Sequence, residues 1–284
     1  MAILGGLAAA AFFATATLCS SRSTRMVPPA SVLAGVMITG LVVLLPALAV
    51  VDVPSPDGAQ AGWLLVSGAG NVVGLLLAYS ALREGKVSVV APVVSTEGAI
   101  AAVAAVVAGE RLQLGAALLL PVIAVGVVLA ATGPTTDLVP ADDGSARTWR
   151  PVLLACAAAL CFGASLYATS KASADLPVPW VLLPARLIGV AAIAVPLAVR
   201  GALTLTRPAL PLVLVAGVCE VLGFASFAAG SRHGVAVAAV LASQFAALAA
   251  VAAFVLFRER LTRLQLSGVS VLALGVATLA AIRA

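Results

Sequence analysis

The chain has 284 residues, of which 63% are hydrophobic and 10% are charged, and its mean hydropathy is +1.19. A soluble domain carries about 25% charged residues, so this composition excludes a soluble enzyme and a soluble binding module. It predicts a multi-pass protein whose immediate partner is the lipid bilayer. The net charge of +5 does not indicate nucleic acid, since excess Lys and Arg in a membrane protein mainly sets orientation.

Ten stretches are apolar and long enough to cross a bilayer, which takes about 20 residues. The expected spans are 2–20, 30–51, 61–82, 87–108, 112–132, 150–170, 179–199, 208–230, 234–257 and 264–282. The first stretch lacks the basic region that precedes the apolar core of a signal peptide, so we expect it to be retained as a span. The polar segment 133–149 is expected to be a solvated linker between the fifth and sixth spans.

The chain repeats itself at an offset of 149 residues, with no gap over Asn71 to Leu129. The matched positions are Gly68/Gly217, Gly74/Gly223, Arg83/Arg232, Gly85/Gly234, Glu110/Glu259, Arg111/Arg260, Leu112/Leu261 and Gly126/Gly275. We therefore expect an all-α fold of two five-helix repeats, at 1–132 and 150–284. Because five crossings bring the chain to the opposite side, the second repeat should be inverted, an arrangement typical of secondary transporters with a site near the midplane.

Two acidic residues fall in the middle of expected spans, Glu97 in the fourth and Glu220 in the eighth. Asn71 is the repeat partner of Glu220 and should lie at a similar depth. A carboxylate at the bilayer centre costs about 2.5–3.5 kcal/mol, so it should face a cavity or a partner. We expect these residues to contact substrate or, for the two acids, to take up a proton. The alternative is that they are buried polar residues that hydrogen-bond between helices.

Two further polar residues are expected beside Glu97. Ser95 precedes it in the fourth span, and Gln244 lies at the matching place in the ninth span. Together they could form a polar patch in an apolar interior. For Gln244 the alternative is a bond between helices, and for Ser95 it is simple packing.

Arg186 lies inside the seventh span, where it could bind an anionic group, pair with Glu220, or extend toward the interface. Tyr79 ends the third span and either faces the cavity or belongs to an interfacial belt. Glu110 and Glu259 sit at helix ends and are expected to stabilise the N-terminus of the following helix. No metal site or cofactor is expected, because the chain has 1 histidine and its 4 cysteines lie in apolar runs.

A family resemblance rests on three segments of the sequence. They are Ala81-Leu82-Arg83-Glu84-Gly85 followed by Ser88-Val89-Val90-Ala91-Pro92, Gly109-Glu110-Arg111-Leu112 with Gly126, and Arg258-Glu259-Arg260-Leu261 with Gly275. These segments resemble EamA-type members of the drug/metabolite transporter (DMT) superfamily. The resemblance implies a plasma-membrane carrier with both termini in the cytoplasm, whereas the distribution of Lys and Arg favours both termini outside.

The resemblance implies a secondary transporter, not an enzyme, that moves a small polar or amphipathic metabolite such as an amino acid by alternating access. Export is the expected direction, and proton coupling and a homodimer are left open. One alternative is efflux of cationic drugs, which calls for acidic residues and aromatic walls, although aromatic residues make up only 5% of the chain. Another is a non-transporting scaffold or an intramembrane enzyme, and an enzyme would need catalytic residues clustered at one depth.

Overall fold

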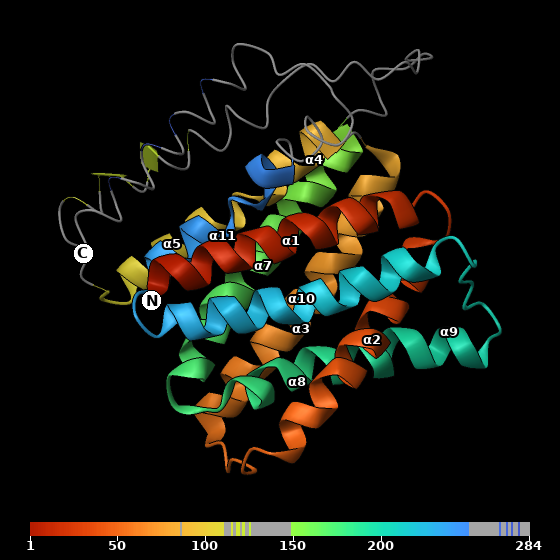
Figure 1. Ribbon diagram of the computed structural model, residues 1–284, viewed down its shortest axis with the longest axis horizontal. Coiled ribbons are helices and arrows are strands. Elements are labelled where there is room, and N and C mark those ends of the chain that lie inside the picture. The colour runs from red at the N-terminus through yellow and green to blue at the C-terminus, as the bar shows by residue number, and fades with distance from the viewer. Residues whose placement is uncertain are drawn as a thin grey trace.

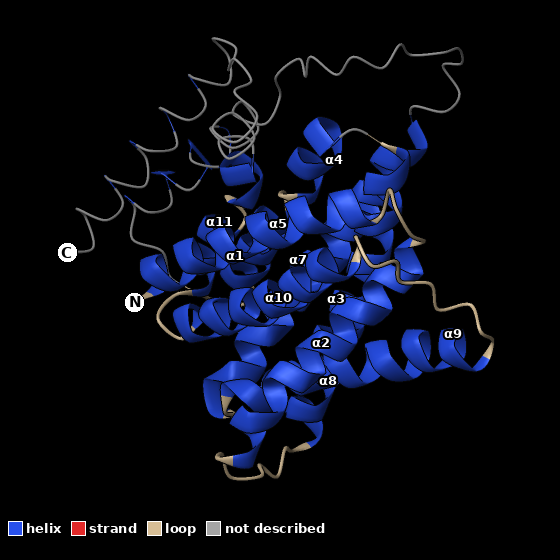
Figure 2. Cartoon of the chain, turned by 45° about the vertical axis from the view of Figure 1, so that its right-hand side comes forward, coloured by secondary structure: helices blue, strands red, loops and turns tan. Residues whose placement is uncertain are grey.

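The computed structural model describes residues 1–85, 87–110 and 149–249, together with single positions between 115 and 125 and between 267 and 278. Within the described residues the secondary structure is entirely helical (Figure 2). Apart from those single positions, the expected spans 112–132 and 264–282 lie outside the described residues, as does the linker up to residue 148.

Six helices of the described part are long and apolar enough to cross a membrane. They are α1 (Ala2–Ser23), α2 (Pro29–Ala49), α3 (Gly58–Glu84), α7 (Trp149–Asp175), the run of α8 (Val178–Gly189), the π-helical turn η2 (Val190–Ala194) and α9 (Val195–Val199), and α10 (Leu210–Ser231). Their positions confirm the first three expected spans and the sixth, seventh and eighth. Many of their large apolar side chains face outward, as contact with lipid requires, among them Val42, Leu45, Leu65, Val73, Leu160, Leu187 and Leu214.

The fourth and ninth expected spans are each interrupted near their middle. The fourth is divided into α4 (Val87–Val94) and α5 (Glu97–Val107), and α11 (Val235–Ala242) likewise ends in the middle of the ninth. At both breaks a side-chain hydroxyl donates to a backbone carbonyl that would accept from a backbone N–H in a continuous helix. Thr96 Oγ1 donates to the Val93 carbonyl over 2.7 Å, and Ser243 Oγ donates to the Val240 carbonyl over 2.8 Å. Such local bonds compete with helical pairing.

The offset of 149 residues relates the two halves in space as well as in sequence. It carries α1 onto α7, α3 onto α10 and α4 onto α11. Helix α1 packs side by side with α10 (Figure 1), and α3 packs with α7, which is the same pair of helices exchanged. A Cβ atom on Gly74 would lie 2.7 Å from the Phe162 ring, and one on Gly223 would lie 2.5 Å from the Phe13 ring. This reciprocal exchange is what an approximate twofold axis between the halves produces.

Glu110 joins the two halves at the start of α11. Its carboxylate accepts a hydrogen bond from the Ala236 backbone N–H, with Oε2 at 3.2 Å. This acid therefore stabilises the N-terminus of a helix in the second half. The helix that it was expected to stabilise, the next one in the chain, lies outside the described residues apart from single positions. A carboxylate in the first turn satisfies an unpaired N–H and complements the helix dipole. Its repeat partner Glu259 lies outside the described residues.

Candidate functional site

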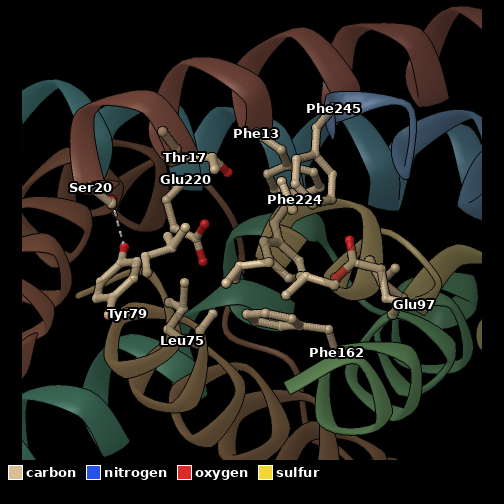
Figure 3. A pocket seen from close by; sticks show the side chains of 17 residues that line it. Phe13, Thr17, Ser20, Leu75, Tyr79, Glu97, Phe162, Glu220, Phe224 and Phe245 are labelled. Atoms are coloured by element: carbon tan, nitrogen blue, oxygen red, sulfur yellow. Dashed lines mark hydrogen bonds between the residues drawn. The ribbon is translucent and has the colours of Figure 1, made fainter. Parts of the chain in front are cut away.

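A pocket lies in the interior, between α1, α3, α4, α5, α7 and α10 (Figure 3). Its lining residues are Phe13, Ala16, Thr17, Ser20, Leu75, Ala78, Tyr79, Leu82, Val90, Ala91, Val94, Glu97, Phe162, Leu166, Glu220, Phe224 and Phe245. Both acids singled out in the sequence are among them. The cavity volume is about 70 Å³, which holds a few water molecules and is smaller than the roughly 300 Å³ of ligand-sized pockets. A metabolite would therefore need the walls to move apart.

Glu97 is the first residue of α5, directly after the break in the fourth span. Its side chain is 5% exposed, and no described residue gives its carboxylate a hydrogen bond or an ion pair. The N-terminal turn of a helix favours a negative charge at this place. The break thus brings an otherwise costly carboxylate into the interior, with its free side turned to the pocket (Figure 3).

Glu220, in contrast, is held by two side chains from outside the pocket. Asn71 Nδ2 donates to Glu220 Oε1 over 2.9 Å, and Arg186 Nη2 lies 3.7 Å from the same oxygen. Arg186 is 1% exposed and also donates from Nη1 to the Met37 sulfur at 3.5 Å. A cation and a carboxylate buried together compensate each other's loss of water, so the charge of Glu220 already has its partner.

These contacts lie on the twofold axis that relates the halves. Asn71 and Glu220 are 149 residues apart, and so are Met37 and Arg186. Two positions related by a twofold rotation can touch each other only where they lie close to its axis. The first half contributes neutral residues to the axis, and the second half contributes an ion pair.

Hydroxyl groups gather at the Glu220 end of the pocket. Ser20 Oγ donates to the Tyr79 hydroxyl over 3.1 Å, and both residues line the pocket together with Thr17. Tyr79 thus faces the cavity and does not belong to a belt at the surface. Figure 3 shows these side chains beside Glu220, with Glu97 at the opposite end.

The polar patch expected around Glu97 does not form on the pocket wall. Gln244 is buried, and its Nε2 donates to the Val240 carbonyl one turn earlier over 2.7 Å. Its Oε1 has no hydrogen-bond partner among the described residues. Ser95 is buried as well, and neither residue lines the pocket. Asn71 and Arg186 reach the pocket only through Glu220.

Sequence reasoning missed the aromatic wall. Four phenylalanines, together with Tyr79, line this pocket in a chain with few aromatic residues: Phe13, Phe162, Phe224 and Phe245. The rings of Phe13 and Phe224 meet edge to face, with centroids 5.2 Å apart. One signal was available, since Phe13 and Phe162 are themselves separated by the repeat offset of 149 residues.

Because Gly223 lies so close to Phe13, we expect even an added methyl group at this position to lower the stability of the folded protein. In Gly223→Ala the new methyl group should displace the Phe13 ring from the pocket wall, and overpacking of this kind costs about 1–3 kcal/mol. We expect a lower melting temperature of the purified protein in detergent. Gly62→Ala is the matched control, because a Cβ atom there meets nothing within 4 Å. Equal melting temperatures for the two variants would contradict the close contact.

Comparison with known proteins identifies the family of the chain and supports its fold. The model of the EamA-like transporter family matches residues 1–132 and again residues 149–281. A crystal structure of a protein with 20% sequence identity covers 99% of this chain and 98% of its own, with a TM-score of 0.76, and this likeness supports the fold alone. No curated protein matches the chain. With both halves matched, the chain belongs to the EamA-like transporter family, consistent with the DMT superfamily.

Proposed function

We propose that this protein is a secondary transporter of the plasma membrane that exports a small polar or amphipathic metabolite by alternating access. The observation that carries the proposal is the interior pocket between two halves related by an approximate twofold axis, with a carboxylate, Glu97, that has no partner among the described residues. Inverted repeats with a site between them are the usual architecture of such carriers. We further propose that the halves are inverted five-helix repeats, 1–132 and 150–284, joined by the linker 133–149.

Unequal helix contacts at the two ends support an alternating cycle. Helix α11 packs on α1 at Gly6, where a Cβ atom would lie 2.7 Å from Leu241 Cβ and 2.9 Å from the Ala238 carbonyl oxygen. Among the described residues the exchanged contact, α4 on α7, is less extensive, and α7 carries Ala155 at the position that matches Gly6. The pocket lies on this looser side, bounded by α4. Tightening one contact while the other loosens would open the site to each side in turn.

Proton coupling is part of the proposal. A carboxylate without a cation beside it is a natural place for a proton when substrate is absent. Among the described residues, the titratable groups on the pocket wall besides Glu97 are Glu220 and Tyr79, and Glu220 is already paired with Arg186. Glu97 is therefore the residue that we propose to exchange a proton for substrate.

Glu97→Gln tests the proposal without changing the shape of the side chain. Cells that overproduce the wild-type chain should release one class of compounds into the medium, and Glu97→Gln at equal membrane level should abolish this release. Glu84→Gln is the matched control, since Glu84 forms a surface pair with Arg150 at 3.1 Å that contributes about 0–1 kcal/mol. Comparative metabolite profiling of the medium gives the readout.

Each outcome of that profiling bears on a different part of the proposal. Equal release by wild type and Glu97→Gln would leave export in place and remove Glu97 from the site. Media that match those of empty cells for every strain would contradict export. A scaffold, the non-transporting alternative, would tolerate Glu97→Gln in whatever assay reports its function.

A further inference from the structure

We propose that the pocket is built for a single positive charge, so that its substrate is an amphipathic monocation such as an arylalkyl amine held by Glu97. This inference rests on the proposed transport function and deepens it. The proposed substrate differs from the amino acid that the sequence analysis gave as an example. The argument depends on where the described structure places its few buried charges.

Only one of the buried acids is left for a ligand. The described interior holds the charges of Glu97, Glu220 and Arg186. Arg186 and Asn71 converge on Glu220 Oε1 from behind the pocket wall, so this carboxylate is already neutralised and held. Glu97 has no such partner among the described residues and faces the cavity. The net charge offered to a ligand is therefore that of one carboxylate.

The described pocket offers no cation to a ligand carboxylate. Arg186 is 1% exposed, does not line the pocket and points its guanidinium at Glu220 and Met37. The other described Lys and Arg residues lie near helix ends or in turns, and none lines the pocket: Arg22, Arg25, Arg83, Arg150, Lys171, Arg200, Arg207 and Arg232. A zwitterionic amino acid would bring its own carboxylate, unpaired, into an acidic and poorly hydrated site. Such juxtaposition of like charges is the usual means by which a site rejects a ligand.

The aromatic wall fits the rest of such a molecule. The phenyl rings of Phe162 and Phe224 lie between Glu97 and Glu220 in the pocket (Figure 3), and Phe13 and Phe245 flank them. Ring faces attract ammonium groups, and rings also stack with an aromatic body. The small share of aromatic residues in the chain argued against cationic substrates. Their concentration at the pocket reverses that argument.

Four small molecules with the same phenylethyl body separate the possibilities. They are phenethylamine, a cation; phenylalanine, a zwitterion; 3-phenylpropionate, an anion; and 2-phenylethanol, which is neutral. Binding to the purified full-length protein is measured by titration calorimetry. We expect phenethylamine to bind at least about tenfold more tightly than phenylalanine or 3-phenylpropionate. In Glu97→Gln its affinity should fall to that of 2-phenylethanol, and in the control Glu84→Gln it should not change.

Three results would overturn the proposal. They are phenylalanine or 3-phenylpropionate binding as tightly as phenethylamine, amine affinity unchanged in Glu97→Gln, and no amine binding at millimolar concentration. Transport is tested separately, by efflux of labelled phenethylamine and phenylalanine from proteoliposomes. Amine that binds but does not cross the membrane would leave the charge assignment standing and contradict the carrier. Phenylalanine that crosses while the amine does not would support the carrier and overturn the charge assignment.

Discussion

Replacing Arg186 with methionine should be among the most destabilising single changes in the chain. Methionine is the residue that the first half carries at the matching position, Met37. The variant leaves Glu220 buried with Asn71 but without its cation. Removing one member of a buried ion pair costs about 3–5 kcal/mol. We expect a sharply lower melting temperature in detergent and a lower level of protein in the membrane.

The double variant Arg186→Met/Glu220→Gln provides the control. It removes both charges, so no uncompensated ion remains, and most of the lost stability should return. It should also keep the preference for phenethylamine over phenylalanine, because Glu97 is unchanged. If Arg186→Met alone melted like the wild type, the ion pair would not be what holds Glu220.

Gly6→Leu should stop transport while the protein remains in the membrane. A Cβ atom at Gly6 would already lie 2.7 Å from Leu241 Cβ, so a leucine side chain would force α11 away from α1. If the cycle requires this contact to close, the release of substrate should fall at least about tenfold, equivalent to about 1.4 kcal/mol in the barrier. The measurement is release per unit of membrane protein.

A matched leucine substitution separates this effect from simple bulk. Gly62→Leu adds the same side chain to α3, at a place where a Cβ atom meets nothing within 4 Å, and should transport normally. Gly6→Ala, with a shorter side chain, should lie between the wild type and Gly6→Leu. Normal release by Gly6→Leu would show that closure of α11 on α1 is not a step of the cycle.

The elements predicted most successfully were those that depend only on contiguous residues of the sequence. Six spans could be placed because apolar runs of sufficient length are contiguous in the chain. The pairing of the halves was also accessible, because a repeat offset is a property of the sequence alone. Glu97 and Glu220 were predicted as site residues because burying a carboxylate within a span costs free energy. The structure brings both to one pocket.

What could not be predicted depends on contacts between distant segments. No local pattern predicts that Arg186 pairs with Glu220. The alternatives, binding an anionic group or extending toward the interface, differ from this pairing only in what surrounds the side chain. Gln244 was expected to join a polar patch beside Glu97, but its side-chain amide instead donates to the Val240 carbonyl in its own span. The aromatic wall combines four phenylalanines that are far apart in the chain. The overall share of aromatic residues gives no sign that these four meet at one pocket.

The unlike pairs on the axis have a consequence for the charges at the centre of the protein. In a dimer of two identical halves, any residue on the axis would meet its own copy. Glu220 would then face a second glutamate, and Arg186 a second arginine, and such buried pairs of like charge repel strongly. The contacts of Glu220 with Asn71 and of Arg186 with Met37 require two halves of different sequence, which this polypeptide supplies. The difference in sequence between the two halves is therefore what allows an ion pair, and not a pair of like charges, at the centre of the protein.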